Sequence, residues 1–411
     1  MKKIQLAIFT LSFISAPLYA AEFFCPSGNV TCLIAAINEA NRNGENNTIN
    51  LEPGTYTLQV IDNNTEGPNG LPSITGRISI LGLFPGGATI TRNVGATAFR
   101  IFHVAASGAL SLDTIEVSQG VSGGGGAAIF NRGELSMNWS MVTRNNGFGL
   151  GSGGTVLINF GRTSVQNTEM SLNFANPLFV RTGVVRNEGE MEISRVRIQD
   201  NDGVGISNIG NLILSDATIE RNLYGIDGIG GGGTVRVERA AIVRNQAYGV
   251  RGVTGTISNS TIADNSSFGV DGTDIQLLNS TVTGNYLGVV GAFIKNSIVT
   301  GNTQQGDCLL SQSLGYNMFT EVSASCETQP SDMIGVDPRL GAFQDLFEPG
   351  RSHYPLLADS PAIDSANPDA CPEFDQLGNP RVGICDRGAI EFQGEATPLV
   401  EEEPTTLAQA E

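Results

Sequence analysis

The fold of this chain is decided by residues 242–290, which read IVRNQAYGVRGVTGTISNSTIADNSSFGVDGTDIQLLNSTVTGNYLGVV. One phrase recurs in this stretch: a β-branched residue, two variable residues and then Asn. Along the chain it occurs at Val142 to Asn145, Ile198 to Asn201, Ile219 to Asn222, Ile242 to Asn245, Ile262 to Asn265, Val282 to Asn285 and Val299 to Asn302. The last six of these asparagines are separated by 21, 23, 20, 20 and 17 residues, so the sequence has a period near 20 residues.

Two further signals keep the same period. Gly followed by Ile or Val comes three or four residues after the Asn, as in Gly249-Val250, and a short alternating run such as Val235-Arg236-Val237 follows later. Each period therefore holds two or three short strands. The connections are too short for crossover helices, and simple hairpins would not produce a 20-residue repeat. Coiling each period once around an apolar axis satisfies both constraints, which predicts an all-β solenoid, a parallel β-helix of roughly ten coils.

The recurring Asn has a physical reason in such a fold. At a fixed bend in every coil, a side-chain amide can donate to and accept from the next coil, and Asn tolerates the left-handed backbone that tight bends require. The alternative is that these asparagines are only turn formers. Either interpretation supports a solenoid.

The ends of a solenoid must be covered, because open strand edges promote aggregation. We expect an N-terminal cap over residues 21–47 with a helix at Leu33 to Asn41, whose apolar residues Leu33, Ala36, Ile37 and Ala40 fall on one face. The coils are expected over 48–306. An irregular C-terminal cap over 307–393 and a disordered acidic tail over 394–411 complete the predicted domain organisation.

The first twenty residues read as a secretory signal peptide, with Lys2 and Lys3 before an apolar run that is too short to span a bilayer. No later segment is long and apolar enough for a transmembrane helix. The formal charge is -18, and loss of the two lysines makes it -20. Such a surface repels nucleic acid, so DNA and RNA are excluded as partners. We expect a secreted, periplasmic or outer-surface location.

Six cysteines in an exported chain suggest disulfides. They fall into three local pairs, Cys25 with Cys32, Cys308 with Cys326 and Cys371 with Cys385. Other pairings are formally possible, and free buried thiols are the alternative. No Cys/His spacing fits zinc, and the two isolated histidines, His103 and His353, do not fit a Ser/His/Asp triad.

Aligned coils place residues at the same repeat position next to each other on the outer face. The position after the Gly-Ile/Val pair gives Asp227, Arg251 and Asp271 as candidate catalytic residues. The two carboxylates would lie about 9.6 Å apart, at twice the sheet spacing, near the upper limit for an inverting glycosidase; a lyase could use Arg251 as its base. The alternative is a structural salt-bridge ladder. The residue before each Asn shows the same mixed charges, in Arg144, Asp200, Arg221, Arg244 and Asp264.

Two acidic clusters are candidate Ca²⁺ sites, because carboxylate oxygens are the ligands that Ca²⁺ prefers. They are Asp200 with Asp202, and Asp274 with Asp271. Neither matches an EF-hand or a glycine-aspartate repeat, and solvated turns are the alternative. No other cofactor is expected.

The two ends of the chain resemble a known family. Cys32 to Asn41, followed by Thr48 to Leu51 and Gly54 to Leu58, resembles the opening of bacterial exported β-helix proteins, although it departs from their Cys-Ser-Leu-Arg-Glu-Ala-Ile at Ser, Arg and Glu. The segment Asp359 to Asp364, with Gly378 to Arg381 and Asp386 to Phe392, is similar to their choice-of-anchor Q module. The resemblance implies a right-handed parallel β-helix at the cell surface or in the medium, and it implies no established chemistry.

These observations lead to two main functional hypotheses and to a third, a purely structural component of the cell envelope. The first is an exported, non-catalytic solenoid that presents a long polar surface for adhesion, with an extracellular polysaccharide or a cell-surface protein as its partner. The second is a polysaccharide lyase or glycoside hydrolase. If the column from Asp227 to Asp271 lies in a cleft walled by long loops and aromatic side chains, the enzyme is favoured. If the column lies on a flat, charge-paired face, adhesion or a structural role is favoured.

Overall fold

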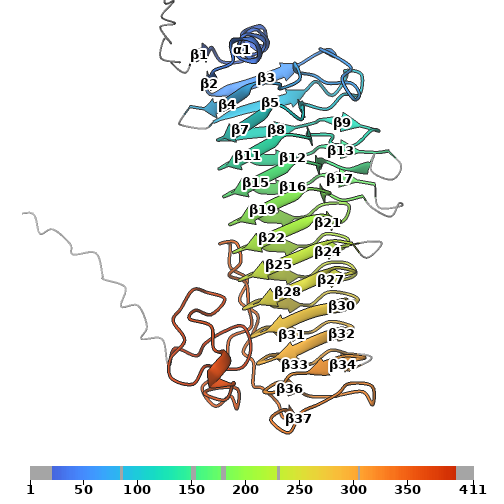
Figure 1. The fold of residues 1–411 in the computed structure, drawn as a ribbon, viewed down its shortest axis with the longest axis vertical. Coiled ribbons are helices and arrows are strands. Elements are labelled where there is room, and N and C mark those ends of the chain that lie inside the picture. Colours follow the sequence, from blue (N-terminus) through green and yellow to red (C-terminus); the bar gives the residue numbers. More distant parts are fainter. Residues whose placement is uncertain are drawn as a thin grey trace, which may run out of the picture.

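The structure is a right-handed parallel β-helix, seen from the side in Figure 1. This computed structural model describes residues 21–83, 87–149, 154–176, 182–228, 232–303 and 306–394. The expected signal peptide and all but the first residue of the expected acidic tail lie outside this part of the chain. Within the described residues there is no helix with the length and apolarity that a membrane crossing requires.

Three sheets run along the stack. Sheet A contains β1 (Glu22–Cys25), β2 (Asn46–Leu51), β4 (Arg77–Gly82), β6 (Phe102–Val104), β7 (Ala109–Asp113), β10 (Ile129–Asn131), β11 (Glu134–Asn138), β14 (Leu157–Asn159), β15 (Arg162–Gln166), β18 (Val185–Asn187), β19 (Glu190–Ser194), β21 (Ile206–Asn208), β22 (Asn211–Ser215), β24 (Ile226–Asp227), β25 (Thr234–Glu238), β27 (Val250–Arg251), β28 (Thr254–Ser258), β30 (Phe268–Leu278), β32 (Leu287–Lys295), β34 (Cys308–Leu309) and β35 (Gln312–Ser313). Sheet B contains β3 (Gly54–Leu58), β5 (Ala88–Arg92), β8 (Ile115–Ser118), β12 (Met141–Thr143), β16 (Glu169–Ser171), β20 (Arg197–Gln199), β23 (Thr218–Glu220), β26 (Ala241–Val243), β29 (Thr261–Ala263), β31 (Thr281–Thr283), β33 (Ile298–Thr300), β36 (Met318–Phe319) and β37 (Met333–Ile334). A small third sheet contains β9 (Val121–Ser122), β13 (Asn146–Gly147) and β17 (Phe174–Ala175).

Each coil contributes two neighbouring strands to sheet A and one to sheet B. The two strand columns of sheet A are separate in most coils and join in the long strands β30 and β32. All strand pairs are parallel, and the repeated apolar positions, such as Ile219, Ile242 and Ile262, are fully buried along the axis. At about 25 cal/mol per Å² of apolar surface, this axial core is the main source of stability.

Sheet B holds 13 strands, so the stack has more coils than the roughly ten that the repeat predicted. The coils between Asn145, Asn173 and Asn201 are 28 residues long, and a period near 20 does not detect them. Asn173 also escaped the sequence pattern because Met170, which is not β-branched, occupies the first position of its phrase.

The predicted asparagine ladder is present at the bend from sheet B back to sheet A. Each Asn amide nitrogen donates to the side-chain oxygen of the next Asn, from Asn145 through 173, 201, 222, 245, 265 and 285 to Asn302. The same oxygen also accepts the backbone N–H of the preceding ladder residue, as Asn265 does from Asn245. Asp307 ends the ladder by accepting from Asn302 at 2.9 Å. The ladder therefore provides buried backbone and amide groups with the partners they need.

A second asparagine ladder lies at the bend between the two strand columns of sheet A. It links Asn131, Asn159, Asn187 and Asn208 at 2.8 to 2.9 Å. Residues with a positive φ occur at two bends. One is the bend from sheet A to sheet B, where Trp139 lies (φ 47°), and the other is the bend of the first ladder, where Arg221 directly precedes Asn222 (φ 52°). At these left-handed positions the chain turns sharply, and long side chains can project away from the stack.

The N-terminal end is covered by a helix, as predicted. α1 (Val30–Asn43) begins after Asn29, whose side chain accepts the N–H of Cys32, and ends at Gly44 in the left-handed conformation. Its buried face consists of the four residues that the sequence indicated, Leu33, Ala36, Ile37 and Ala40. Strand β1 already belongs to sheet A and pairs with β2, so the stack begins before the expected boundary at residue 48.

The stack also continues past residue 306, where the C-terminal cap was expected to begin. Strands β34 to β37 pair with the coils above them, and the irregular cap proper spans residues 335–394, with η2 (Pro368–Ala370) as its one described helical turn. Asp307 takes the place of the next ladder asparagine in these last coils, which hides the repeat. The three local cysteine pairs are disulfides, as expected.

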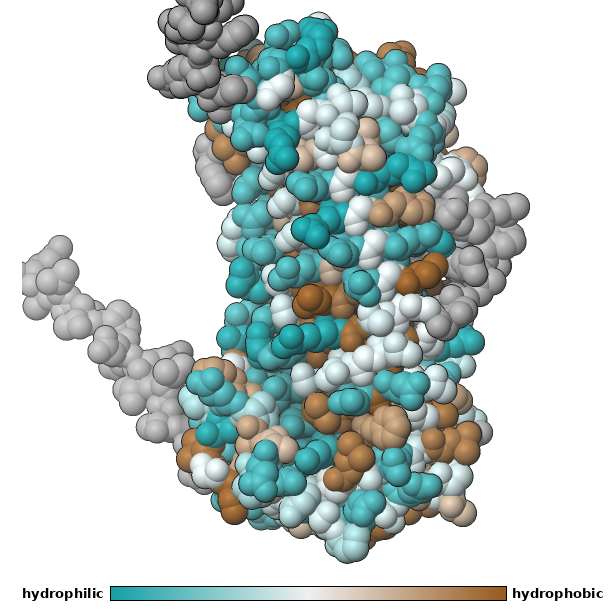
Figure 2. All heavy atoms as spheres, viewed as in Figure 1, coloured by the Kyte–Doolittle hydropathy of each residue, from teal (hydrophilic) through white to brown (hydrophobic). Residues whose placement is uncertain are grey.

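The cap folds back along the outer face of sheet B (Figure 1). Ala241, Val243 and Ala263 on that face pack against Phe343 and Tyr354 of the cap. A second contact joins Ile298 and Met318 to Leu356 and Ala362. Figure 2 shows that apolar residues are more frequent around the cap and the last coils than on the upper coils.

The ladder yields a stability test in adjacent residues. Asn145 is buried and makes side-chain bonds to Gly120, Val117, Thr143 and Asn173, whereas the next residue, Asn146, is exposed. Asn145→Ala leaves several buried groups unpaired, so we expect the free energy of unfolding to fall by about 3 kcal/mol. Asn146→Ala is the control and should change it by less than about 0.5 kcal/mol. If the two variants lower the free energy of unfolding equally in urea denaturation, the ladder does not stabilise the fold as proposed.

Candidate functional site

The structure brings Asp227, Arg251 and Asp271 into one column, as the repeat predicted. They are register partners on β24, β27 and β30. Asp227 is only 1% exposed, and neither of its carboxylate oxygens has a hydrogen-bond partner. Burial raises the pKa of Asp227 to about 6, an effect that Arg251 opposes and Asp271 reinforces. In this conformation no substrate can touch the Asp227 oxygens.

The other two members of the column form a charge pair at its partly exposed end. Arg251 Nε lies 4.0 Å from Asp271 Oδ2, and its guanidinium lies 4.7 Å from the ring centre of Tyr248. Burial also raises the pKa of Asp271. The column matches a structural charge ladder better than an open acid–base pair, and the catalytic role proposed for it stays a prediction.

The predicted Ca²⁺ sites are not assembled. Among the described residues, no group of three or more His, Cys, Asp or Glu side chains is placed to hold a metal. Asp200 is held by two bonds from Arg221, at 2.7 and 3.0 Å, and Asn201 between the two acids points into the buried ladder. Asp202 is exposed, and Asp274 lies in a left-handed bend within the long strand β30. Ca²⁺ binding by these acidic residues therefore stays a prediction.

A cleft that the sequence did not predict lies between the coils and the cap. Its volume is about 660 Å³. One side consists of the bend before sheet B and the first residues of β12, β16 and β20, and the other consists of cap residues. The lining residues are Trp139, Ser140, Met141, Asn167, Thr168, Glu169, Arg195, Arg197, Asp216, Phe347, Glu348, Pro349, Arg351, Gln376, Leu377 and Gly378. We call it the cap cleft.

The coil side of the cap cleft presents one residue from each of four successive bends. Trp139, Asn167, Arg195 and Asp216 all have φ between 46° and 51°, and this left-handed backbone projects their side chains away from the core. Trp139 is the only tryptophan in the chain, and it is 63% exposed. A large aromatic side chain is therefore available to a ligand in the cleft.

The cap side is formed mainly by residues 343–351, which we call the strap. Asp345 accepts a 2.5 Å bond from Arg244, and the N–H of Gly350 donates to Thr218 Oγ1 at 2.9 Å. Gly350 has φ 82°, and a Cβ there would lie 2.6 Å from the carbonyl oxygen of Arg239, so only glycine permits this approach to the coils. Phe347, near the middle of the strap, is 84% exposed.

Charged side chains in the cap cleft differ in whether they are already paired. Asp216 is bound by Arg239 at 2.7 and 2.9 Å, and Glu348 by Arg351 at 2.9 Å. Glu169 accepts a bond only from the amide of Gln199, at 3.2 Å, and takes part in no ion pair among the described residues. Arg195 donates to Asn167 at 2.8 Å and likewise lacks a described ion pair. A carboxylate and a guanidinium thus remain available to a ligand.

Two features of the sequence mark this region. Trp139 directly follows the alternating strand β11, at the bend that leads to β12, and a large aromatic side chain at a bend has no core to fill. The strands from Ala241 to Val243 and from Thr261 to Ala263 are not alternating but largely apolar, which is typical of strands covered on both faces. They mark where the cap docks.

Comparisons with known proteins add information about the fold. No protein-family model matches the sequence, and no curated protein matches it. Among solved structures, the pectate lyase Pel9A has a TM-score of 0.53 at 15% identity, over 91% of this chain and 97% of that one. This chain shares its fold with a pectate lyase. The mannuronan C-5 epimerase AlgE4 A-module of Azotobacter vinelandii is more distant, with a TM-score of 0.47 at 14% identity over 75% of this chain and 90% of that one.

The buried carboxyl group gives a pH-dependent prediction. Because the pKa of Asp227 rises from 3.8 to about 6 on folding, its contribution to stability is fully present below pH 4 and is lost as the pH rises through 6. Asn does not titrate. Relative to the wild type, Asp227→Asn should therefore gain about 2 kcal/mol of unfolding free energy between pH 4 and pH 7.5.

The exposed Asp202 provides the matched control for this measurement. In chemical denaturation, the difference in unfolding free energy between Asp202→Asn and the wild type should be the same at both pH values. If the stability difference between Asp227→Asn and the wild type does not change with pH, the Asp227 carboxyl group is hydrated. That result would contradict its buried position in this structure.

Proposed function

We propose that the protein binds a polysaccharide in the cap cleft and cleaves it as a lyase. The observation that carries the proposal is the combination, in one cleft, of two exposed aromatic side chains with an unpaired carboxylate and an unpaired guanidinium. The polysaccharide lyase or glycoside hydrolase considered from the sequence is thereby favoured over a purely adhesive solenoid.

The aromatic residues support a sugar ligand. The flat apolar face of a sugar ring packs on an aromatic ring, while its hydroxyl groups bond to surrounding polar side chains. Trp139 and Phe347 offer such surfaces, and Asn167, Arg195 and Glu169 supply donors and acceptors. Successive coils present these groups about every 4.8 Å along the stack, which suits a polymer lying along it.

The unpaired charges support cleavage by elimination. Glu169 is positioned to act as a base that removes the proton next to a uronate carboxylate, which Arg195 would neutralise. The glycosidic C–O bond on the adjacent carbon then breaks, a C=C double bond forms, and the leaving oxygen takes a proton from water. A hydrolase requires two available carboxyl groups, and the other carboxylates of the cleft, Asp216 and Glu348, are held in ion pairs. The fold shared with a pectate lyase supports this choice by analogy.

The second candidate function is binding without cleavage. It is favoured by the column of Asp227, Arg251 and Asp271, in which Asp227 is buried and Asp271 is paired with Arg251, so the column offers no open acid–base pair. In that case the long polar surface of the stack would hold the glycan for adhesion. The product assay described below separates the two functions.

We also infer that the protein works outside the cytoplasm. Three disulfides require an oxidising compartment, and residues 1–20 read as an export signal. The similarity of the C-terminal cap to a choice-of-anchor Q module supports a place at the bacterial cell surface. Detection of the chain without residues 1–20 in a surface or medium fraction would test this location.

Binding is tested through the single tryptophan. Addition of polygalacturonate or alginate should change the fluorescence of Trp139, whereas neutral dextran should not. By calorimetry, Trp139→Ala should weaken binding roughly thirtyfold with little change in Tm, because the side chain is exposed. Phe24→Ala removes an aromatic residue of similar exposure (65%) at the far end of the stack and should bind normally. Wild-type protein that binds no acidic glycan would overturn the proposal.

Cleavage is tested by the appearance of unsaturated products, followed by ultraviolet absorbance. Glu169→Gln should lower the rate by a factor of about 10² to 10⁴ and leave glycan affinity within a few-fold of the wild type. Glu192→Gln, which removes an exposed carboxylate on sheet A, is the control. Reducing ends without unsaturation would indicate a hydrolase, and binding without either product would indicate the adhesive function.

A further inference from the structure

We propose that Arg197 is the residue that positions Phe347 as the outer wall of the cap cleft, and that its buried ion pair with Glu220 holds it in place for this role. This inference rests on the proposed function, because it assigns the wall that a bound glycan would contact. It concerns a residue that is almost fully buried and that a ligand would not need to touch.

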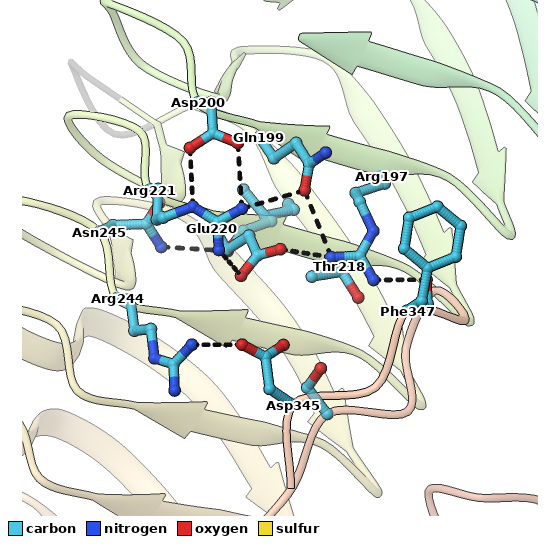
Figure 3. Close-up of polar contacts among 12 residues, drawn as sticks. Arg197, Gln199, Asp200, Thr218, Glu220, Arg221, Arg244, Asn245, Asp345 and Phe347 are labelled. Carbon is cyan, nitrogen blue, oxygen red and sulfur yellow. Dashed lines mark hydrogen bonds and ion pairs between the residues drawn. The ribbon is translucent and has the colours of Figure 1, made fainter. Parts of the chain in front are cut away.

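Arg197 connects the coils directly to the middle of the strap. Its Nη2 donates to the carbonyl oxygens of Leu346, at 2.8 Å, and of Phe347. Its guanidinium carbon also lies 5.2 Å from the ring centre of Phe347. One planar guanidinium therefore fixes both the backbone and the ring of the same residue (Figure 3).

Arg197 is itself held in place from the coil side. Its Nη1 bonds to Glu220, whose side chain is 1% exposed, and to Gln199 at 3.3 Å. Glu220 also forms an ion pair with Arg221 at 2.5 Å, and Arg221 donates two hydrogen bonds to the carboxylate of Asp200. The chain Arg197–Glu220–Arg221–Asp200 alternates in sign, so its buried charges are compensated and its geometry is fixed (Figure 3).

Phe347 has no apolar core that could hold it instead. With 84% of its surface exposed, it gains little from burial, and its position depends on what holds the strap. The strap is attached at Asp345 by Arg244 and at Gly350 by Thr218 and Gln376. Between these two attachments, Arg197 supplies the described bonds from the coils to the backbone. Within the strap, Ser352 bonds to both backbone groups of Leu346, and the N–H of Arg351 donates to the carbonyl oxygen of Glu348. These bonds shape the strap but do not attach Phe347 to the coils, so Arg197 makes that attachment.

The chemistry of the contact requires arginine. A guanidinium has donors on two sides of one plane, so it can bind Glu220 with one edge and two carbonyl oxygens with another. Lysine would keep the charge next to Glu220 but could not span both partners. Arg197→Lys thus separates positioning of the strap from compensation of the buried Glu220.

Strap position is measured without any glycan, by hydrogen exchange of the purified full chain. The N–H of Leu346 donates to Ser352 Oγ and that of Arg351 to the carbonyl oxygen of Glu348, so both report on the strap. In Arg197→Lys these two amides should exchange about tenfold faster than in the wild type, while the coil amides keep their rates. Arg162→Lys, which alters an exposed two-bond contact to Glu190 on sheet A, is the control and should leave the strap unchanged. Unchanged exchange in Arg197→Lys would overturn the proposal even if no glycan is found.

The effect on the cleft is measured with a double-mutant cycle on polygalacturonate or alginate binding. Arg197→Lys and Phe347→Ala should each weaken binding about tenfold, and the double variant should be no weaker than Phe347→Ala alone. Additive losses, or normal affinity of Arg197→Lys with a mobile strap, would overturn the positioning role. Failure of the wild type to bind any glycan would instead refute the proposed function, and the exchange result would still decide the position of the strap.

Discussion

The buried bends are the constraint on which this structure depends. A parallel β-helix turns several times in each coil, and at each turn backbone N–H and C=O groups lose their partners in the sheets while they remain inside the stack. An unpaired buried group costs about 1 to 3 kcal/mol. The asparagine ladder meets this cost at one bend, where each side chain bonds both to the backbone and to the next asparagine, and a second ladder meets it at another.

The same bends determine where function can be placed. Since the inward residues are committed to the core and the ladders, only outward positions can vary, and the left-handed residues at two of the bends project furthest. One such column carries Trp139 and Arg195 into the cap cleft, and the other carries Asp200 and Arg221 into the ion-pair chain behind it. The cap completes the site by docking where the outer face of sheet B changes from polar to apolar.

Much of the architecture could be predicted from the sequence because it is local. The β-branched residue and the Asn of each phrase lie within four positions, so a single coil reveals them, and the helix face at Leu33 to Ala40 and the three disulfides are equally local. The repeat did not reveal the 28-residue coils, because Met170 stands where the other coils have a β-branched residue. Register placed Asp227, Arg251 and Asp271 in one column, but the burial of Asp227 depends on packing that the repeat does not encode. The cap cleft joins residues 139–216 to 347–378, and no spacing within either segment shows how the cap folds back.

A crystal structure of the complex with an acidic oligosaccharide tests the central claim most directly. The account predicts sugar rings packed on Trp139 and Phe347, with a ring carboxylate near Arg195 and the Glu169 carboxylate within hydrogen-bond distance of the adjacent ring carbon's hydrogen. A ligand bound along sheet A, or over the column of Asp227, Arg251 and Asp271 with the cap cleft empty, would contradict it.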